Sequence, residues 1–167
     1  MIDKTIICLS ARANSGKTTS IRELFFRLTG HYPESTGDFL SIVQDKNVEH
    51  GIGISSVGDS WGNREPIEKL IDAGCEIIVC ASRTSKDTLR TAQTLAKEGG
   101  YKFIRIHAAH IETENDTFCE HFYHKNAEAI ENVIKSIIQE HLTQLLPFEL
   151  FSKKFCLNIS ELGLEIV

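Results

Sequence analysis

Residues 5–19 read TIICLSARANSGKTT, and this stretch decides the fold of the chain. Its first part, Thr5–Leu9, is a short apolar run with β-branched residues, which is typical of a buried strand. After the stretch, four apolar residues recur on one face at helical spacing: Ile21, Leu24, Phe25 and Leu28. The segment between them, Ala11–Thr18, matches a known pattern. The pattern is Ala or Gly, any four residues, Gly, Lys, and then Ser or Thr. The sequence therefore predicts a strand, a glycine-containing loop and a helix.

The residue types of this loop suit the binding of phosphate. Backbone N–H groups at a helix N-terminus converge on an anion, and the helix dipole favours negative charge there. Gly16 lets the backbone approach phosphate closely, Lys17 is expected to bridge the β- and γ-phosphates, and the Thr18 hydroxyl is expected to bind Mg²⁺. The predicted nucleotide-binding residues are Ala13, Asn14, Ser15, Gly16, Lys17, Thr18 and Thr19.

The pattern resembles that of the P-loop NTPase superfamily. The stricter form of the superfamily pattern has Gly where this chain has Ala11, and the looser form accepts Ala. The resemblance implies a three-layer α/β fold with a mostly parallel central sheet and helices on both faces. It also implies one nucleotide-binding domain, residues 1–167, that binds ATP with Mg²⁺ and either hydrolyses it or transfers a phosphoryl group.

The pattern along the rest of the chain predicts the same class of fold, because strand and helix signals alternate. Further strands are predicted at 39–44, 50–57, 76–81 and 101–106. The first two are joined by a turn too short for a parallel return, so they form an antiparallel hairpin. Helices are predicted from Pro66 to Gly74, over 85–98 and over 126–142, with a polar loop at 112–117. Residues 155–159 and 162–167 are predicted to form short strands or a docked tail.

A carboxylate is expected beside Thr18, where it would help to hold Mg²⁺. Asp59 follows the strand at 50–57, in the place of the superfamily's second, acidic motif; it also fits the cap of a turn or helix. The run Asp59-Ser60-Trp61-Gly62 is similar to the Asp-x-x-Gly element of GTPases. The later segment SRTSKD, at 82–87, departs from the guanine-reading pattern of GTPases, because its Lys and Asp are adjacent. The sequence therefore favours ATP over GTP.

Basic side chains follow the predicted strand at 76–81. Ligands of open α/β sheets bind at the carboxyl ends of strands, so Arg83 is expected to face the γ-phosphate. There it would act as a transition-state charge partner or hold a substrate. Lys86 and Arg90 either extend this positive charge or belong to a solvated helix start. The predicted catalytic residues are Lys17, Asp59 and Arg83, and the predicted metal ligands are Thr18 and Asp59.

Ligand-type side chains also gather late in the chain: His107, His110, Cys119, His121 and His124. Their spacing differs from known zinc patterns, so exposed or capping histidines are expected there. His107 ends a predicted strand at the ligand-binding edge and is an alternative contact for substrate or base. Five cysteines without a close pairing motif indicate reduced thiols in a cytoplasmic protein.

Composition limits the partners. The net charge of −5 over 167 residues argues against nucleic acid. No apolar stretch reaches membrane-spanning length, and the N-terminus lacks a signal-peptide layout. Two alternatives to a simple ATPase stay open. One is a kinase for a small molecule or nucleotide, with an unidentified acceptor. The other is a slow nucleotide-dependent switch, possibly GTP-binding, that signals to a protein partner through segments 31–38 and 60–65.

Overall fold

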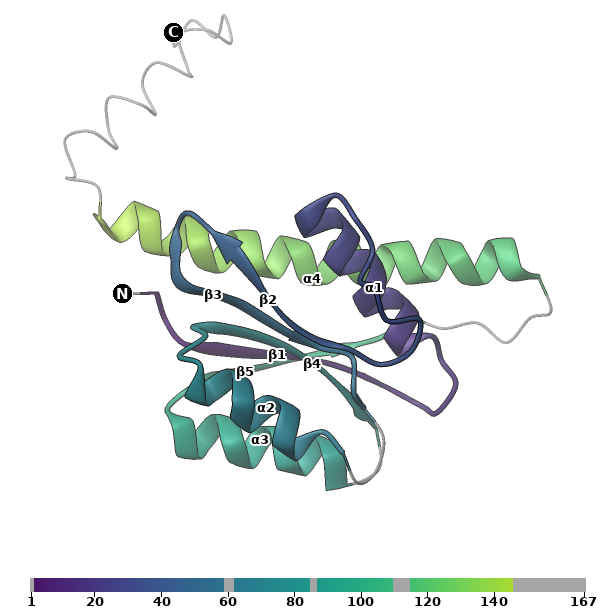
Figure 1. The fold of residues 1–167 in the computed structure, drawn as a ribbon, viewed down its shortest axis with the longest axis horizontal. Helices are drawn as coiled ribbons and strands as arrows, with labels where there is room; N and C mark the ends of the chain where they lie inside the picture. The colour runs from purple at the N-terminus through teal and green to yellow at the C-terminus, as the bar shows by residue number, and fades with distance from the viewer. Residues whose placement is uncertain (1, 59–61, 85–86, 110–114, 146–167) are drawn as a thin grey trace, which may run out of the picture.

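The computed structural model describes residues 2–58, 62–84, 87–109 and 115–145 (Figure 1). Nine helices and strands follow one another in this part of the chain. They are β1 (Thr5–Ala11), α1 (Lys17–Thr29), β2 (Leu40–Asp45), β3 (Val48–Ser55), α2 (Arg64–Asp72), β4 (Ile77–Arg83), α3 (Asp87–Gly99), β5 (Lys102–His107) and α4 (Asp116–Leu145).

The strands form one mixed sheet in the order β2-β3-β4-β1-β5. Strands β3, β4, β1 and β5 run parallel, and β2 pairs with β3 in the antiparallel direction. The prediction of a mostly parallel α/β sheet with one antiparallel hairpin is therefore confirmed. Because parallel strands point the same way, the carboxyl ends of β1, β3, β4 and β5 meet at one edge of the sheet.

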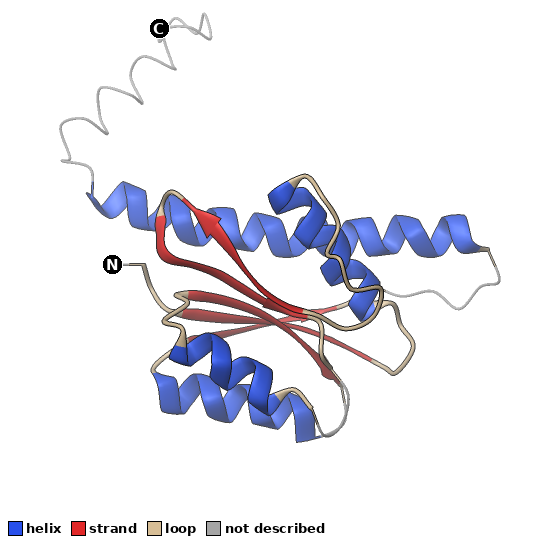
Figure 2. Ribbon diagram, in the orientation of Figure 1, coloured by secondary structure: helices blue, strands red, loops and turns tan. Residues whose placement is uncertain are grey.

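Helices cover both faces of the sheet (Figure 2). Successive side chains of a strand point to opposite faces, so each buried strand contributes to two cores. Ile7 and Leu9 of β1 pack with α1 and α4, whereas Ile6 and Cys8 pack with α2 and α3. Strand β1 is buried along its whole length because strands flank it on both sides and helices cover both faces.

Helix α4 is longer than the sequence predicts. The prediction placed residues 112–117 in a loop and began the helix at 126, but α4 begins at Asp116. The helix start is capped by Asn115, whose backbone and side-chain oxygens accept hydrogen bonds from the Phe118 N–H at 3.2 and 3.3 Å. The first turns carry mainly polar residues, so they lack the apolar periodicity that revealed the rest of the helix.

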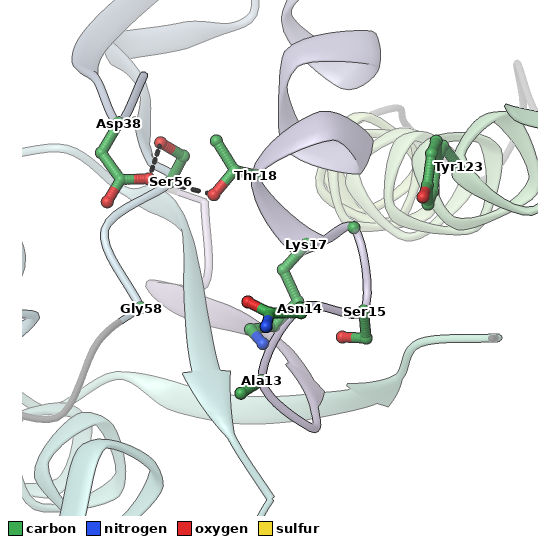
Figure 3. A pocket seen from close by; sticks show the side chains of 10 residues that line it. Ala13, Asn14, Ser15, Lys17, Thr18, Asp38, Ser56, Gly58 and Tyr123 are labelled. Carbon is green, nitrogen blue, oxygen red and sulfur yellow. Dashed lines mark hydrogen bonds between the residues drawn. The ribbon is translucent and has the colours of Figure 1, made fainter. Parts of the chain in front are cut away.

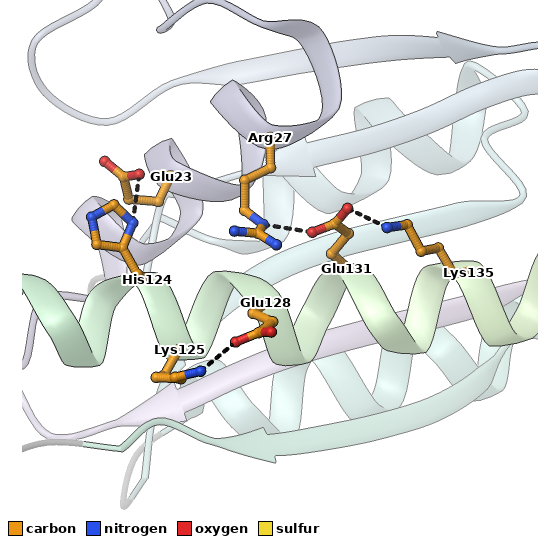
Figure 4. Close-up of polar contacts among 7 residues, drawn as sticks. All are labelled: Glu23, Arg27, His124, Lys125, Glu128, Glu131 and Lys135. Atoms are coloured by element: carbon orange, nitrogen blue, oxygen red, sulfur yellow. Dashed lines mark hydrogen bonds and ion pairs between the residues drawn. The ribbon is translucent and has the colours of Figure 1, made fainter.

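Charged contacts join α4 to α1 (Figure 4). Glu131 of α4 lies 2.5 Å from Nε of Arg27 and 2.6 Å from Nζ of Lys135. Closer to the N-terminus of α1, His124 lies 3.1 Å from Glu23. These contacts fix how α4 lies along α1, the helix that follows the glycine-containing loop.

The remaining differences concern boundaries. Strand β3 spans Val48–Ser55 rather than 50–57, because the hairpin turn is only two residues long and Asp45 Oδ1 accepts from the Asn47 N–H at 2.8 Å. The predicted strands at 155–159 and 162–167 lie outside the described residues. Within the described residues, no helix is both long enough and apolar enough to cross a membrane.

Candidate functional site

The loop between β1 and α1 has an unusual backbone conformation. Asn14 and Gly16 both have positive φ angles, of 56° and 74°. The buried Ser15 hydroxyl donates to the Arg12 carbonyl at 2.8 Å and holds the loop closed. Left-handed residues in such a loop direct neighbouring N–H groups into a concave surface that binds anions. Helix α1 begins directly after this loop, at Lys17, so the positive end of its dipole lies beside the loop.

Lys17 lies over this loop. Its Nζ donates to the Arg12 carbonyl at 2.6 Å and to the Ala11 carbonyl at 3.4 Å. The side chain is therefore folded back toward the end of β1, and its positive charge adds to that of the helix N-terminus.

A cavity of about 380 Å³ opens beside the loop and α1 (Figure 3). Its volume lies within the range of small-ligand sites. The residues that line it are Ala13, Asn14, Ser15, Gly16, Lys17, Thr18, Asp38, Ser56, Gly58 and Tyr123. All the predicted nucleotide-binding residues except Thr19 are in this lining; Thr19 lies exposed on the first turn of α1.

Asp38 is a site residue that the sequence did not reveal. Its Oδ1 accepts from the Thr18 hydroxyl at 3.0 Å and from the Ser56 hydroxyl at 3.2 Å. Ser56 is buried just after β3, where its hydroxyl also accepts from the Phe39 N–H at 2.9 Å. The segment before β2 thus brings a carboxylate to the predicted metal-binding hydroxyl of Thr18. The sequence signal was slight: an Asp directly before a predicted strand.

Tyr123 of α4 packs against Gly16 of the loop, on the side opposite Asp38 (Figure 3). A Cβ atom added to Gly16 would lie 1.9 Å from Tyr123 Cε1. Glycine is thus required here twice, for its positive φ and for the ring above it. Burial raises the pKa of Tyr123, and Cys119, Asp116 and Glu120 on the same helix raise it further, so the phenol stays protonated at neutral pH.

Of the other predicted catalytic residues, the structure describes Arg83 but not Asp59. Asp59 lies outside the described residues, directly after Gly58, which lines the cavity. Arg83 is the last residue of β4 and pairs in register with Ala11, so it lies at the expected edge. Its N–H donates to Thr88 Oγ1 at 3.0 Å, and it is not among the described residues that line the cavity. Lys86 and Trp61 lie outside the described residues.

A second cavity of about 480 Å³ adjoins the same loop at the ends of β1, β4 and β5. It is lined by Ser10, Ala11, Arg12, Ser15, Thr84, His107 and Ala108. His107 therefore lies at the edge of the sheet where the parallel strands end, as the sequence predicts, but it is not among the described residues that line the cavity with Thr18 and Asp38. Arg90 is exposed on α3.

Among the residues described, no three His, Cys, Asp or Glu side chains are grouped so that they could hold an ion. The Thr18 hydroxyl and the Asp38 carboxylate offer two oxygen ligands. Mg²⁺ commonly takes one or two protein oxygens and completes its shell with phosphate oxygens and water, so this pair fits the ion.

Comparisons with known proteins return no match, whether to a protein-family model, to a curated protein or to a solved structure.

Proposed function

We propose that this chain is a Mg²⁺-dependent NTPase of the P-loop type, with the three-layer fold of that superfamily. It binds ATP and either hydrolyses the γ-phosphate or transfers it to a small-molecule acceptor. The loop supports this proposal, because its left-handed residues, the N-terminus of α1 and Lys17 all favour an anion at one place.

The observation that carries the proposal is the position of Asp38. A carboxylate that contacts Thr18, on the first turn of α1, lies close to the place where phosphate would bind. Two anions so close repel each other unless a cation lies between them. A nucleotide bound with Mg²⁺ removes this conflict, since the metal is held by Thr18, by Asp38 and by phosphate oxygens.

Each residue then has a role. Lys17 neutralises charge on the β- and γ-phosphates, and Thr18 and Asp38 hold the metal. Asp59 is proposed as a second carboxylate near the metal. Arg83 is proposed either to stabilise charge on the γ-phosphate in the transition state or to hold the acceptor. A metal held by Thr18 and Asp38 would supply positive charge that neutralises the transferring γ-phosphate.

A nucleotide-dependent switch is the second candidate, and the segment between α1 and β2 supports it. This segment ends at Asp38, and its other contacts with α1 include two hydrogen bonds: the Arg22 guanidinium donates to the Ser35 carbonyl, and the Tyr32 hydroxyl donates to Glu23 at 2.7 Å. A ligand that moves Asp38 would therefore also change the conformation of this segment. Its surface carries an exposed stack of Phe26 and Tyr32, with ring centroids 4.7 Å apart, for a protein partner.

Replacing Lys17 tests the phosphate site. We expect Lys17→Ala to lower the affinity for MgATP by a factor of about 30 to 100, because a charge-assisted contact to phosphate contributes roughly 2–3 kcal/mol. Calorimetric titration with MgATP, MgGTP and non-hydrolysable analogues measures this loss and the choice of base. Lys97→Ala is the matched control, since Lys97 is exposed on α3. A folded Lys17→Ala protein with unchanged affinity would contradict the proposal.

The rate of ATP consumption separates the candidate functions. A kinase consumes ATP much faster when its acceptor is added, whereas an ATPase does not. Slow turnover combined with nucleotide-dependent binding to another protein would favour the switch.

A further inference from the structure

The cavity beside α1 has two chemically different ends. Figure 3 shows Asp38 and Ser56 on one side of the first turn of α1 and Tyr123 on the other. The first end carries a carboxylate and hydroxyls, which are ligands for a hard cation. The second end carries the aromatic ring of Tyr123, and Lys17 of the loop lies between the two ends.

These ends set a direction for a bound nucleotide. A Mg²⁺ ion held by Thr18 and Asp38 would neutralise the terminal phosphates, so the γ-phosphate is expected on that side of the cavity. The nucleoside then leaves the loop toward the opposite end of the cavity. We propose that Tyr123 is the residue on which the nucleoside of the bound nucleotide packs. This inference rests on the proposed function, since it presupposes a nucleotide in the loop.

Tyr123 is well placed for this role. Its ring is half-buried, so part of it is in contact with Gly16 and part stays open to the cavity. One turn along α4, the buried Asn126 donates to the Ser20 hydroxyl of α1 at 3.2 Å, which fixes the helix that carries the ring. An aromatic face accepts any base by stacking, and a protonated phenol does not repel the phosphates.

The second cavity is the competing location for the nucleoside. It adjoins the same loop at the ends of β1, β4 and β5 and presents Arg12 and His107. Among the described lining residues it shares only Ser15 with the first cavity and contains neither Thr18 nor Asp38, so a nucleotide whose metal is held by that pair would have to extend past Ser15 to reach it.

The test compares MgATP with magnesium tripolyphosphate, which keeps the phosphates and lacks the nucleoside. We expect Tyr123→Ala to lower the ratio of the two affinities by about tenfold, the usual effect of losing one stacked ring. Tyr123→Phe should keep the wild-type ratio. Phe118→Ala is the matched control, because Phe118 is an exposed aromatic residue of the same helix. Far-ultraviolet circular dichroism shows whether each variant is folded.

The outcomes separate the two proposals. A wild-type protein that binds neither compound overturns the proposed function, and this inference with it. A wild-type protein that binds both equally, or a Tyr123→Ala protein with an unchanged ratio, overturns this inference alone.

A second experiment uses the wild-type protein, so its result does not depend on whether Tyr123→Ala folds. Photolabelling with 8-azido-ATP, followed by peptide mass spectrometry, should modify the peptide that contains Tyr123. Competition by unlabelled ATP should remove the label. A label on the peptides that contain Arg12 or His107 would place the base in the second cavity and overturn the inference.

Discussion

Asp38 joins two parts of the chain that the sequence keeps apart, since it accepts hydrogen bonds from Thr18 of α1 and from Ser56 after β3. Its charge has opposite consequences with and without metal. With Mg²⁺ present it attracts the ion, and without Mg²⁺ it repels the phosphates of a nucleotide.

Replacing Asp38 by Asn tests this reversal. We expect Asp38→Asn to weaken binding of ATP in Mg²⁺ by about tenfold and to leave ATP binding in EDTA unchanged or tighter. The amide keeps an acceptor for the Thr18 hydroxyl but loses the charge. Calorimetric titrations under both conditions measure the effect, with the exposed Asp72→Asn as control.

Asp59→Asn belongs in the same experiment, because that residue is the carboxylate expected from the sequence. If Asp59 is the main metal carboxylate, its variant loses the Mg²⁺ requirement and Asp38→Asn keeps it. Equal losses in the two variants would indicate that both carboxylates surround the ion. If neither variant alters the Mg²⁺ dependence, no metal is held at this end of the cavity.

The residues of the site were predictable only where they are contiguous. Gly16, Lys17 and Thr18 follow a spacing imposed by the turn from strand to helix, so one short window contains the signal. Asp38 lies 20 residues beyond Thr18 in the sequence, and it accepts hydrogen bonds from both Thr18 and Ser56 in the fold. No local rule fixes the separation in sequence between Thr18 and such a carboxylate. Tyr123 comes from the last described helix, in a polar region without a clear period.

At the scale of elements, Asn126 joins three segments. It is 3% exposed, and its side chain donates to Ser20 of α1 at 3.2 Å and to the Ala109 carbonyl at 3.1 Å, and accepts from the Ala109 N–H at 2.8 Å. Ala109 lies just after β5. One amide therefore connects α1, α4 and the segment after β5 close to the loop.

Removing this amide should destabilise the protein. We expect Asn126→Ala to lower the free energy of unfolding by about 1–3 kcal/mol, because the buried Ser20 hydroxyl and the backbone of Ala109 lose their partner. Urea denaturation followed by circular dichroism measures the change. Asn132→Ala is the control, since Asn132 is exposed on the same helix. Similar midpoints for the two variants would show that Asn126 contributes little to the packing of α4.

The elements themselves were predictable to different degrees. The hairpin of β2 and β3 followed from the length of its turn, and the buried strands followed from their continuous apolar residues. The first ten residues of α4 were missed because helical periodicity is visible only where a face is buried in an apolar core. There the helix is stabilised instead by the Asn115 cap and by polar contacts such as that between His124 and Glu23.

At the scale of the whole molecule, α4 crosses the face of the sheet and completes the core that contains Ile21, Leu24 and Ile130. Glu131 lies next to Ile130 and contacts Arg27 and Lys135 at the edge of this core. Burial raises the pKa of Glu131, but the hydrogen bonds from Lys135 and Arg27 outweigh it, and the pKa lies below its ordinary value of 4.5. The folded protein therefore holds the ionised form more strongly than the unfolded chain does.

This lowered pKa predicts how the stability of the protein changes in acid. The stabilisation by Glu131 is fully present above about pH 4.5 and is lost as the pH falls through the lower pKa of the folded state. We expect Glu131→Gln to destabilise the protein by about 1 kcal/mol at pH 7, and the difference from wild type to shrink below pH 4.5. Urea denaturation across pH 3–7, a range set by the ordinary carboxyl pKa, measures this difference.

Glu128→Gln supplies the comparison, because Glu128 is on the same helix and pairs with Lys125 at 2.8 Å, but its side chain is 42% exposed. Solvent screens such a pair, so the unfolding midpoint of this variant should stay close to that of wild type across the same pH range. If Glu131→Gln behaves the same way, the contacts with Arg27 and Lys135 do not hold α4 on α1. The apolar core would then hold the two helices together without them.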